Sequence, residues 1–491
     1  MALDPRTPVI VGAGQLTQRC DPADALEPVD MMVEAARRAA ADATSASVLA
    51  ALQSVRVVNL LSWRYLDPAA LVAERVGASP VETAYTPMGG NTPQSLVNKT
   101  ALDIQAGRLD VAMLTGGEAV RTRNALRKLD QRPDWTEQPE GTAPTTVLGK
   151  DVPMNHPHEL SRGVVMPVQI YPMVENALRA AAGRSLADHH DRISRLWSRF
   201  SEVAATNPHA WIQEARTPEE IGTPSPTNRM VGFPYPKLMN SNNDVDQAAA
   251  VIMCSVEAAR AHGIPEDRWV FPWSGSDAHD HPYVSHRDDL YSSPAIRIAG
   301  TRALSLAGVG VDDLSHVDLY SCFPSAVQIG ADELGLSLER DLTVTGGLSF
   351  FGGPWNNYVM HSIATMVELL RGSDDIGLVT ANGGYVTKHA FGVYSARPPA
   401  TPFRHADVQA EVDALPARAL AEEHDGPVTV ETYTVMHERD GSPATAFAAC
   451  LTPDGARTWA TSTDADVMKA MVTEEVCGRP GTVSDATLHL T

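Results

Sequence analysis

The sequence predicts an α/β protein with two similar halves, an inserted subdomain and an additional small β domain at its C-terminal end. Three observations support this prediction. Nearly all-apolar strands alternate with Ala-rich helices, as in sheets covered by helices on both faces. A motif of glycines, helix and strand occurs twice, at residues 89–117 and 352–384. Beyond residue 428, apolar and polar side chains alternate, which is typical of half-buried strands.

The N-terminal elements follow the order strand, helix, strand. Pro8–Gly14 is a short β-rich run that ends in glycines, and an Ala-rich stretch predicts a helix over 29–41. Residues 55–61 then have the composition of a second buried strand. This order favours an α/β sheet over an all-helical or all-β fold.

Each copy of the repeated motif reads Gly-Gly, helix, Gly, Asp, buried strand, Gly-Gly. In the first copy Gly89-Gly90 opens the helix and 109–117 is the strand, and in the second these are Gly352-Gly353 and 375–384. A helix and strand within 296–320 likewise repeat the early helix and strand. Duplication of an α/β unit is the simplest explanation.

The region after the first copy changes in composition to Pro, His, Trp and charged residues, with helical periodicity only over 173–182 and 193–205. Its length favours an inserted subdomain over an ordinary loop. The Asp-Gly turns at 440–441 and 454–455 predict hairpins of a small β-barrel. The expected boundaries are 1–120 (first half), 121–240 (insertion), 241–265 (completion of the first half), 266–395 (second half), 396–427 (linker) and 428–491 (β domain).

Composition and charge narrow the classes of function. The 491 residues include 39 Lys and Arg against 60 Asp and Glu, a formal charge of -21, which disfavours nucleic acid and anionic membranes as partners. No apolar run is long enough for a membrane helix, and the start lacks a signal-peptide pattern, so a cytoplasmic protein is expected. The five cysteines are scattered and are expected to be reduced, and the histidine spacings match no metal-ligand pattern, so no metal is expected.

The paired halves, the Gly-rich helix starts and the segment Asn243–Ala250 together resemble thiolases over residues 7–395. The resemblance implies a thiolase fold, which is an α/β/α/β/α sandwich, with a loop subdomain that grips coenzyme A, and acyl-thioester chemistry. With the oligonucleotide-binding-like β domain at the C-terminal end, the chain is most similar to the thiolase-like proteins of type 1 from mycobacteria and related actinobacteria.

Thiolases use a cysteine at a helix N-terminus to take the acyl group, because a thiolate is a strong nucleophile. The resemblance places that cysteine at Gly90, its activating histidine at Gly353, and the second cysteine at Ala381 or Asn382. Tyr320 stands where relatives have the residue that orients a water in the oxyanion hole. The resemblance therefore implies that ordinary thiolysis and Claisen condensation are absent.

Two phenols are candidates for acid or base chemistry. Tyr320 is the first, and Tyr358, shortly after Gly353, is the second, by analogy with thiolase-like steroid side-chain aldolases that work with a separate β-barrel partner. Alternatively, both tyrosines are packed in the core without a role in chemistry. The pair Lys388-His389 lies either at the mouth of the pocket or in solvent. Further pocket candidates are Asn91, Ser321, Cys322 and His389.

The expected function is that of an acyl-CoA-binding protein related to acetyl-CoA acetyltransferases, in lipid or sterol metabolism, without thiolase activity. Coenzyme A or an acyl-CoA is the expected ligand, and no covalently bound cofactor is expected. One alternative is a retro-aldol lyase acting on a β-hydroxyacyl-CoA, with Tyr320 as base. The other is a non-catalytic scaffold that holds a protein partner through the C-terminal domain.

The strand over 83–88 corresponds to the one through which thiolases usually dimerise. Pro87 removes a backbone donor from this strand. The sequence therefore predicts a monomer or a weak dimer.

Overall fold

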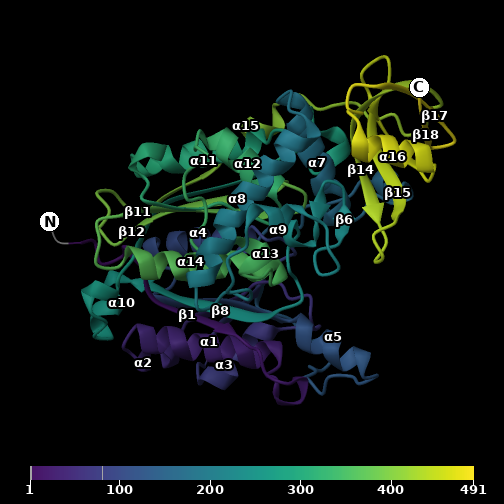
Figure 1. Cartoon of the computed structure of the whole chain (residues 1–491). Coiled ribbons are helices and arrows are strands. Elements are labelled where there is room, and N and C mark those ends of the chain that lie inside the picture. The colour runs from purple at the N-terminus through teal and green to yellow at the C-terminus, as the bar shows by residue number, and fades with distance from the viewer. Residues whose placement is uncertain (1–2, 80) are drawn as a thin grey trace.

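The computed structural model describes residues 3–79 and 81–491. Two large sheets form separate layers, with helices outside and between them, so the core is an α/β/α/β/α sandwich (Figure 1). The predicted fold class is confirmed. The C-terminal residues form a further small domain beside one end of the sandwich, drawn in yellow in Figure 1.

The first sheet has the strand order β1-β8-β4-β2-β3-β5. The long strand β8 pairs with β1 on one side and β4 on the other, antiparallel to both, and every residue of β8 is buried. The bounds are β1 Pro8–Thr17, β2 Ser54–Val57, β3 Glu82–Tyr85, β4 Val111–Ala119, β5 Thr146–Val147 and β8 Asp246–Ser255.

The second sheet has the order β10-β11-β12-β9-β13. Strand β11, from the second copy of the repeat, is fully buried and pairs with β10 and β12. The bounds are β9 Phe271–His279, β10 His316–Asp318, β11 Ile376–Gly383, β12 Lys388–Ser395 and β13 Arg404–Asp407.

Helices α4 and α14, one from each copy of the repeat, form the central layer because each contacts strands of both sheets. Helices α1 and α3 cover the outer face of the first sheet, and α11 covers that of the second and packs against α12. The bounds are α1 Pro28–Asp42, α2 Ser47–Ala50, α3 Pro68–Val76, α4 Thr92–Gln105, α10 Val256–Ala261, α11 Pro294–Ala307, α12 Pro324–Leu334, α13 Gly347–Phe350 and α14 Tyr358–Leu370.

The inserted region is mostly helical and contributes two short strands to the C-terminal sheet. Strand β6 pairs with β14 at Gly232 and Met436, and helix α7 packs on β14. The bounds are α5 Val120–Lys128, α6 Pro157–Ser161, α7 Pro167–Ala181, α8 Leu186–Thr206, α9 Pro218–Gly222, β6 Met230–Gly232 and β7 Tyr235–Pro236.

The C-terminal domain is a small closed β-barrel, as predicted. Its ring of pairings runs β14-β15-β16-β18-β17 and returns to β14, and it encloses apolar side chains such as Val430, Cys450 and Leu488. Both predicted Asp-Gly turns join consecutive strands of this ring. The bounds are β14 Gly426–His437, β15 Pro443–Leu451, β16 Arg457–Ser462, α16 Ala465–Thr473, β17 Pro480–Ser484 and β18 Thr487–Leu490.

Several segments differ from the sequence-based expectations, among them helix α8, which begins at Leu186 rather than at residue 193. Residues 396–427, expected as a linker, include β13 and the short helix α15 (Gln409–Asp413), because β13 adds to the open edge of β9. Strand β2 ends at Val57, where its pairing with β3 and β4 stops, rather than at Leu61. Helix α7 begins at Pro167, before the expected residue 173.

The strand expected to form a dimer has its outer edge covered within the same chain. Strand β5 pairs in parallel with β3, at Ala84 with Thr146 and Tyr85 with Val147. This pairing occupies the outer edge of β3 at Ala84 and Tyr85, where a second subunit would otherwise pair. Within the described residues, no helix is both long enough and apolar enough to cross a membrane.

Candidate active site

A cavity of about 180 Å³ lies where the two halves of the sandwich meet the inserted region. Its wall contains Gly89 and Gly90 from the loop before α4, Tyr320 and Cys322 from the loop after β10, and Asn382 near the end of β11. Helix α7 contributes Tyr171. The first copy of the repeat, the second half and the insertion thus all contribute to one site.

Gly90 has no room for a side chain. A Cβ atom built on Gly90 would lie 2.4 Å from the backbone oxygen of Asn382 and 2.7 Å from the hydroxyl oxygen of Tyr320. Both distances are far below van der Waals contact, and the nearer atom belongs to the backbone of β11. The Tyr320 phenol therefore lies beside the place where the resemblance expects a cysteine side chain.

A backbone hydrogen bond and a ring contact hold Tyr320 in place. Its N–H donates to Thr380 Oγ1 at 2.9 Å, and its ring meets the edge of the Tyr358 ring, with centroids 5.6 Å apart. Burial raises the pKa of Tyr320 well above its ordinary value. The hydroxyl therefore stays protonated near neutral pH, which suits a hydrogen-bond donor or acid and opposes the role of base.

Asn382 and Tyr171 form one wall of the cavity. The Asn382 amide donates to Tyr171 Oη at 3.1 Å, and this phenol also accepts the Val386 N–H at 3.0 Å and donates to the Gly384 carbonyl at 3.1 Å. The Asn382 Oδ1 atom is buried without a hydrogen-bond partner among the described residues. A buried acceptor without a partner is costly, so a ligand N–H or O–H would satisfy it.

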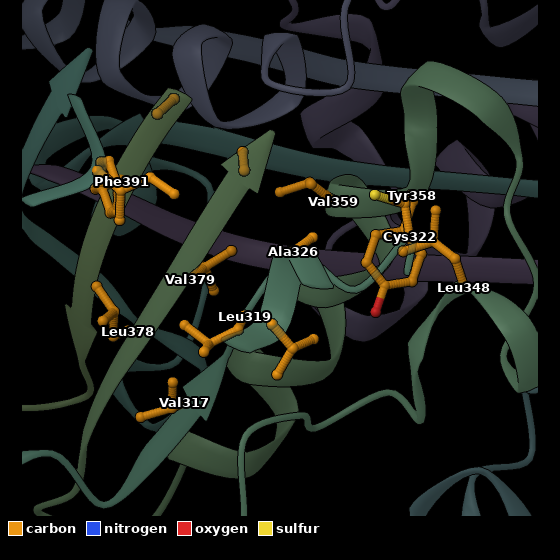
Figure 2. Close-up of a cluster of buried hydrophobic side chains, with 14 of the residues drawn as sticks. Val317, Leu319, Cys322, Ala326, Leu348, Tyr358, Val359, Leu378, Val379 and Phe391 are labelled. Atoms are coloured by element: carbon orange, nitrogen blue, oxygen red, sulfur yellow. The ribbon is translucent and has the colours of Figure 1, made fainter. Parts of the chain in front are cut away.

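Cys322 brings a thiol into the cavity wall, but the thiol is not activated. Burial raises its pKa to about 12, so the thiolate is scarcely populated near neutral pH. Figure 2 shows Cys322 close to Leu348 and Tyr358, at one end of the apolar cluster that includes residues of β10 and β11. Its surroundings are those of an inert buried cysteine.

Gly353 also lies against a side chain that fills its space. A Cβ atom on Gly353 would lie 2.7 Å from Asn243 Oδ1. Asn243 lines the cavity, as does Asn356, which accepts the Gly89 N–H at 3.1 Å and donates to the Asn59 carbonyl at 3.0 Å. Amide side chains thus occupy the region where the resemblance expects a histidine, and one of them fixes the glycine loop.

Of the predicted site residues, Gly90, Tyr320, Cys322 and Asn382 line this cavity. Tyr358 and Ser321 lie in the core instead. The Tyr358 side chain is fully buried, and its hydroxyl contacts Thr345 Oγ1 at 2.5 Å and Ser321 Oγ at 3.4 Å. Asn91 and His389 line a different cavity, on the other side of the glycine loop.

The sequence-based prediction missed Tyr171, Asn243 and Asn356 as wall residues. Tyr171 lies in the inserted region, where no site residue was expected, and Asn243 belonged to the motif that pointed to the family. The polar cluster Asn356-Asn357, directly after Gly-Gly-Pro-Trp, was the available signal for the third residue. Among the described residues, no group of three His, Cys, Asp or Glu side chains is placed to hold a metal ion.

The whole chain is similar to the structure of a monomeric SCP2-thiolase-like protein type 1 from Mycobacterium smegmatis. The two are 34% identical, the match covers 100% of both chains, and the TM-score is 0.85. Residues 407–487 match the family described as the thiolase-like protein type 1 additional C-terminal domain. These matches cover both the sandwich and the barrel.

Proteins of lower identity match about four fifths of the chain. An Ltp2-ChsH2(DUF35) aldolase is 19% identical, over 80% of this chain and 99% of that one, with a TM-score of 0.61. The Acat5 thiolase from Ascaris suum, solved with coenzyme A, is 16% identical over 79% and 99%, with a TM-score of 0.57. At these identities the likeness shows the fold only.

Part of the chain is also similar to a curated protein. An acetyl-CoA acetyltransferase of Methanocaldococcus jannaschii is 22% identical over 272 residues, which make up 54% of this chain. The match spans 60% of the length of that relative.

Proposed function

Because the chain belongs to the SCP2-thiolase-like proteins of type 1, which are related to acetyl-CoA acetyltransferases, we propose that it binds an acyl-CoA without becoming acylated. The thioester end of the ligand would enter the cavity beside Gly90 and Tyr320. The protein would act in lipid or sterol metabolism in the cytoplasm. The protein would catalyse neither thiolysis nor Claisen condensation.

The observation that carries the proposal is the filled space around Gly90. Acyl transfer through the enzyme needs a nucleophile, and a side chain at Gly90 would overlap Asn382 and Tyr320. The thiol in the cavity wall, Cys322, has a raised pKa, and no histidine lines the cavity within the described part of the chain. Nucleophile and activating base are therefore both missing from the cavity.

Groups that bind a thioester are nevertheless present. At the start of α4 the Thr92 N–H donates to the Gly89 carbonyl at 3.1 Å and Pro93 has no N–H, so the helix favours a carbonyl oxygen through the positive end of its dipole. The Tyr320 hydroxyl lies next to this N-terminus, and the unpaired Asn382 Oδ1 offers an acceptor to an amide N–H. The arrangement supports binding through hydrogen bonds without covalent chemistry.

We expect an acyl-CoA to stabilise the protein against heat. A ligand at about a hundred times its dissociation constant adds about 2.7 kcal/mol to the free energy of unfolding. Thermal-shift titrations with coenzyme A, acetyl-CoA, acetoacetyl-CoA and a sterol side-chain CoA ester measure this effect, and intact-mass spectrometry checks for acylation.

Two variants make the binding experiment specific. Val168→Phe places a larger side chain in the cavity wall and should weaken binding, whereas Leu160→Phe changes an exposed residue outside the cavity of the same inserted region. The proposal is abandoned if no ester shifts the transition, or if acetyl-CoA acylates the protein.

The geometry also favours a second candidate function, retro-aldol cleavage of a β-hydroxyacyl-CoA. The specific observation is the Tyr320 hydroxyl beside the helix N-terminus at Gly90. Because burial keeps the phenol protonated, Tyr320 would donate its proton to the thioester oxygen as the carbon–carbon bond breaks, rather than act as the base. The proton of the β-hydroxyl would pass to solvent water as the carbonyl product forms, and the enol would then become the acyl-CoA product by taking a proton at its α-carbon and returning one to Tyr320.

For this second function, Tyr320→Phe is expected to lower the rate of cleavage about a hundredfold, the lower end of general acid catalysis. Tyr358→Phe is the matched control, because that hydroxyl is hydrogen-bonded in the core outside the cavity. The rate is measured by release of the carbonyl product from a β-hydroxyacyl-CoA. Equal rates for Tyr320→Phe and the unchanged protein rule the lyase out.

A further inference from the structure

A second and larger cavity, of about 340 Å³, lies on the other side of the glycine loop. It is a partly open cavity bordered by α4, the segment 148–152, the adjoining ends of β9 and β12, and β13. Met88 lines both cavities. Much of the wall is apolar, from Pro87, Leu96, Leu102, Leu148, Val152 and Ala278.

Lys388 places a buried ammonium in this wall. It begins β12, its exposed fraction is 4%, and its Nζ donates to the Met88 carbonyl at 3.0 Å. In the described part of the chain its ammonium forms no ion pair with a carboxylate, and burial lowers its pKa. An ammonium carries three donors, so one neutral carbonyl leaves it incompletely satisfied.

The carboxylate of Asp277 in the cavity wall is hydrogen-bonded to side chains other than Lys388. Asp277 accepts hydrogen bonds from His405 Nε2 at 2.7 Å, from Asn98 Nδ2 at 2.8 Å and from Ser95 Oγ. Asp151, on the neighbouring segment, favours the charged form of Lys388 only through the longer-range field. The Lys388 cation is therefore available to a ligand.

Other charged side chains also line the cavity, among them the exposed Lys150. Lys99 pairs with Asp103, and Asp407 accepts the Gln409 N–H at 3.1 Å. His279 Nδ1 lies 2.9 Å from the Asp280 carbonyl. An apolar chamber of this size with one unpaired buried cation suits a ligand that has an apolar body and one negative group.

We propose that this second cavity binds a free carboxylic acid with a short apolar chain, its carboxylate paired with Lys388 and its chain against Leu96, Leu148 and Val152. The site is separate from the acyl-CoA cavity. It needs neither coenzyme A nor any reaction at Tyr320.

The test measures binding of octanoate to the full-length protein by isothermal titration calorimetry. Octanamide, which has the same chain without the charge, is the matched ligand. Charge-assisted hydrogen bonds to an ammonium are worth about tenfold or more in affinity, so octanoate should bind at least that much more tightly than octanamide.

Lys388→Met keeps the approximate length of the side chain and removes its charge. It should lower the affinity for octanoate to the affinity for octanamide. Lys469→Met, on the distant helix α16, is the control and should leave binding unchanged. Val152→Trp fills the same cavity from a short connecting segment and provides an independent variant if Lys388→Met does not fold.

Three results would overturn the proposal. Octanoate fails to bind, or it binds equally to Lys388→Met or Val152→Trp, or its binding is lost in Val168→Phe while Lys388→Met retains it. The last result would place the fatty acid in the first cavity instead.

Discussion

Arg457→Met is expected to lower the free energy of unfolding by about 3–5 kcal/mol, the usual cost of removing one partner of a buried ion pair. The Arg457 side chain is 0% exposed. Its Nε and Nη2 atoms donate to the two carboxylate oxygens of Glu431, each at 2.6 Å. The substitution leaves this carboxylate without its partner in a largely buried position.

Arg457 also joins the barrel to the sandwich. Its Nη1 donates to the carbonyls of Val284, Ser285 and Arg287 at 3.1, 2.9 and 2.6 Å. Nearby, Trp459 Nε1 donates to Ser285 Oγ at 2.8 Å, and this hydroxyl in turn donates to Glu159 of the inserted region at 2.6 Å. Loss of the guanidinium therefore removes contacts between domains as well as within the barrel.

Urea denaturation measures the effect of Arg457→Met. The matched control is Arg479→Met in the same domain, whose pair with Glu474 at 2.9 Å is at the surface and should contribute no more than about 1 kcal/mol. If Arg457→Met and Arg479→Met unfold at the same urea concentration, the buried junction does not stabilise the chain.

Gly90→Cys is expected to destabilise the protein by about 3 kcal/mol and to leave it without thiolase activity. Overpacking of a filled site costs about 1–3 kcal/mol, and here the nearest atom is a backbone oxygen that cannot rotate away. Adding Tyr320→Phe should not rescue the variant, because the 2.4 Å approach to the Asn382 carbonyl persists.

Gly310→Ala is the control for the glycine substitution. A Cβ atom on Gly310 would have Asp313 Oδ2 as its nearest neighbour, at 3.8 Å, which is ordinary contact, and the φ of -103° at Gly310 suits any residue. Urea denaturation and intact-mass spectrometry after incubation with acetyl-CoA are the measurements. A stable Gly90→Cys protein that forms an acyl-thioester would show that the space around Gly90 is open.

Elements with strong periodicity were predictable from the sequence. Helices α4 and α14 and strands β4 and β11 follow the glycine motifs at 89–117 and 352–384, because buried elements need apolar residues at helical or strand spacing. The barrel was predictable from alternation and two Asp-Gly turns. Strand β13 was not, since its residues Arg404–Asp407 lack an apolar pattern and form a strand only because β9 offers a free edge.

The sequence by itself determined the fold class, the duplication and the absence of side chains at Gly90 and Gly353. Only the tertiary structure decided which phenol reaches the cavity. Tyr320 lies against Gly90, whereas the Tyr358 hydroxyl is hydrogen-bonded to Thr345 in the core. It also decided that Lys388 is buried with one carbonyl partner. Periodicity records burial along one element, whereas these contacts join residues far apart in the chain, and their distances depend on how whole layers pack.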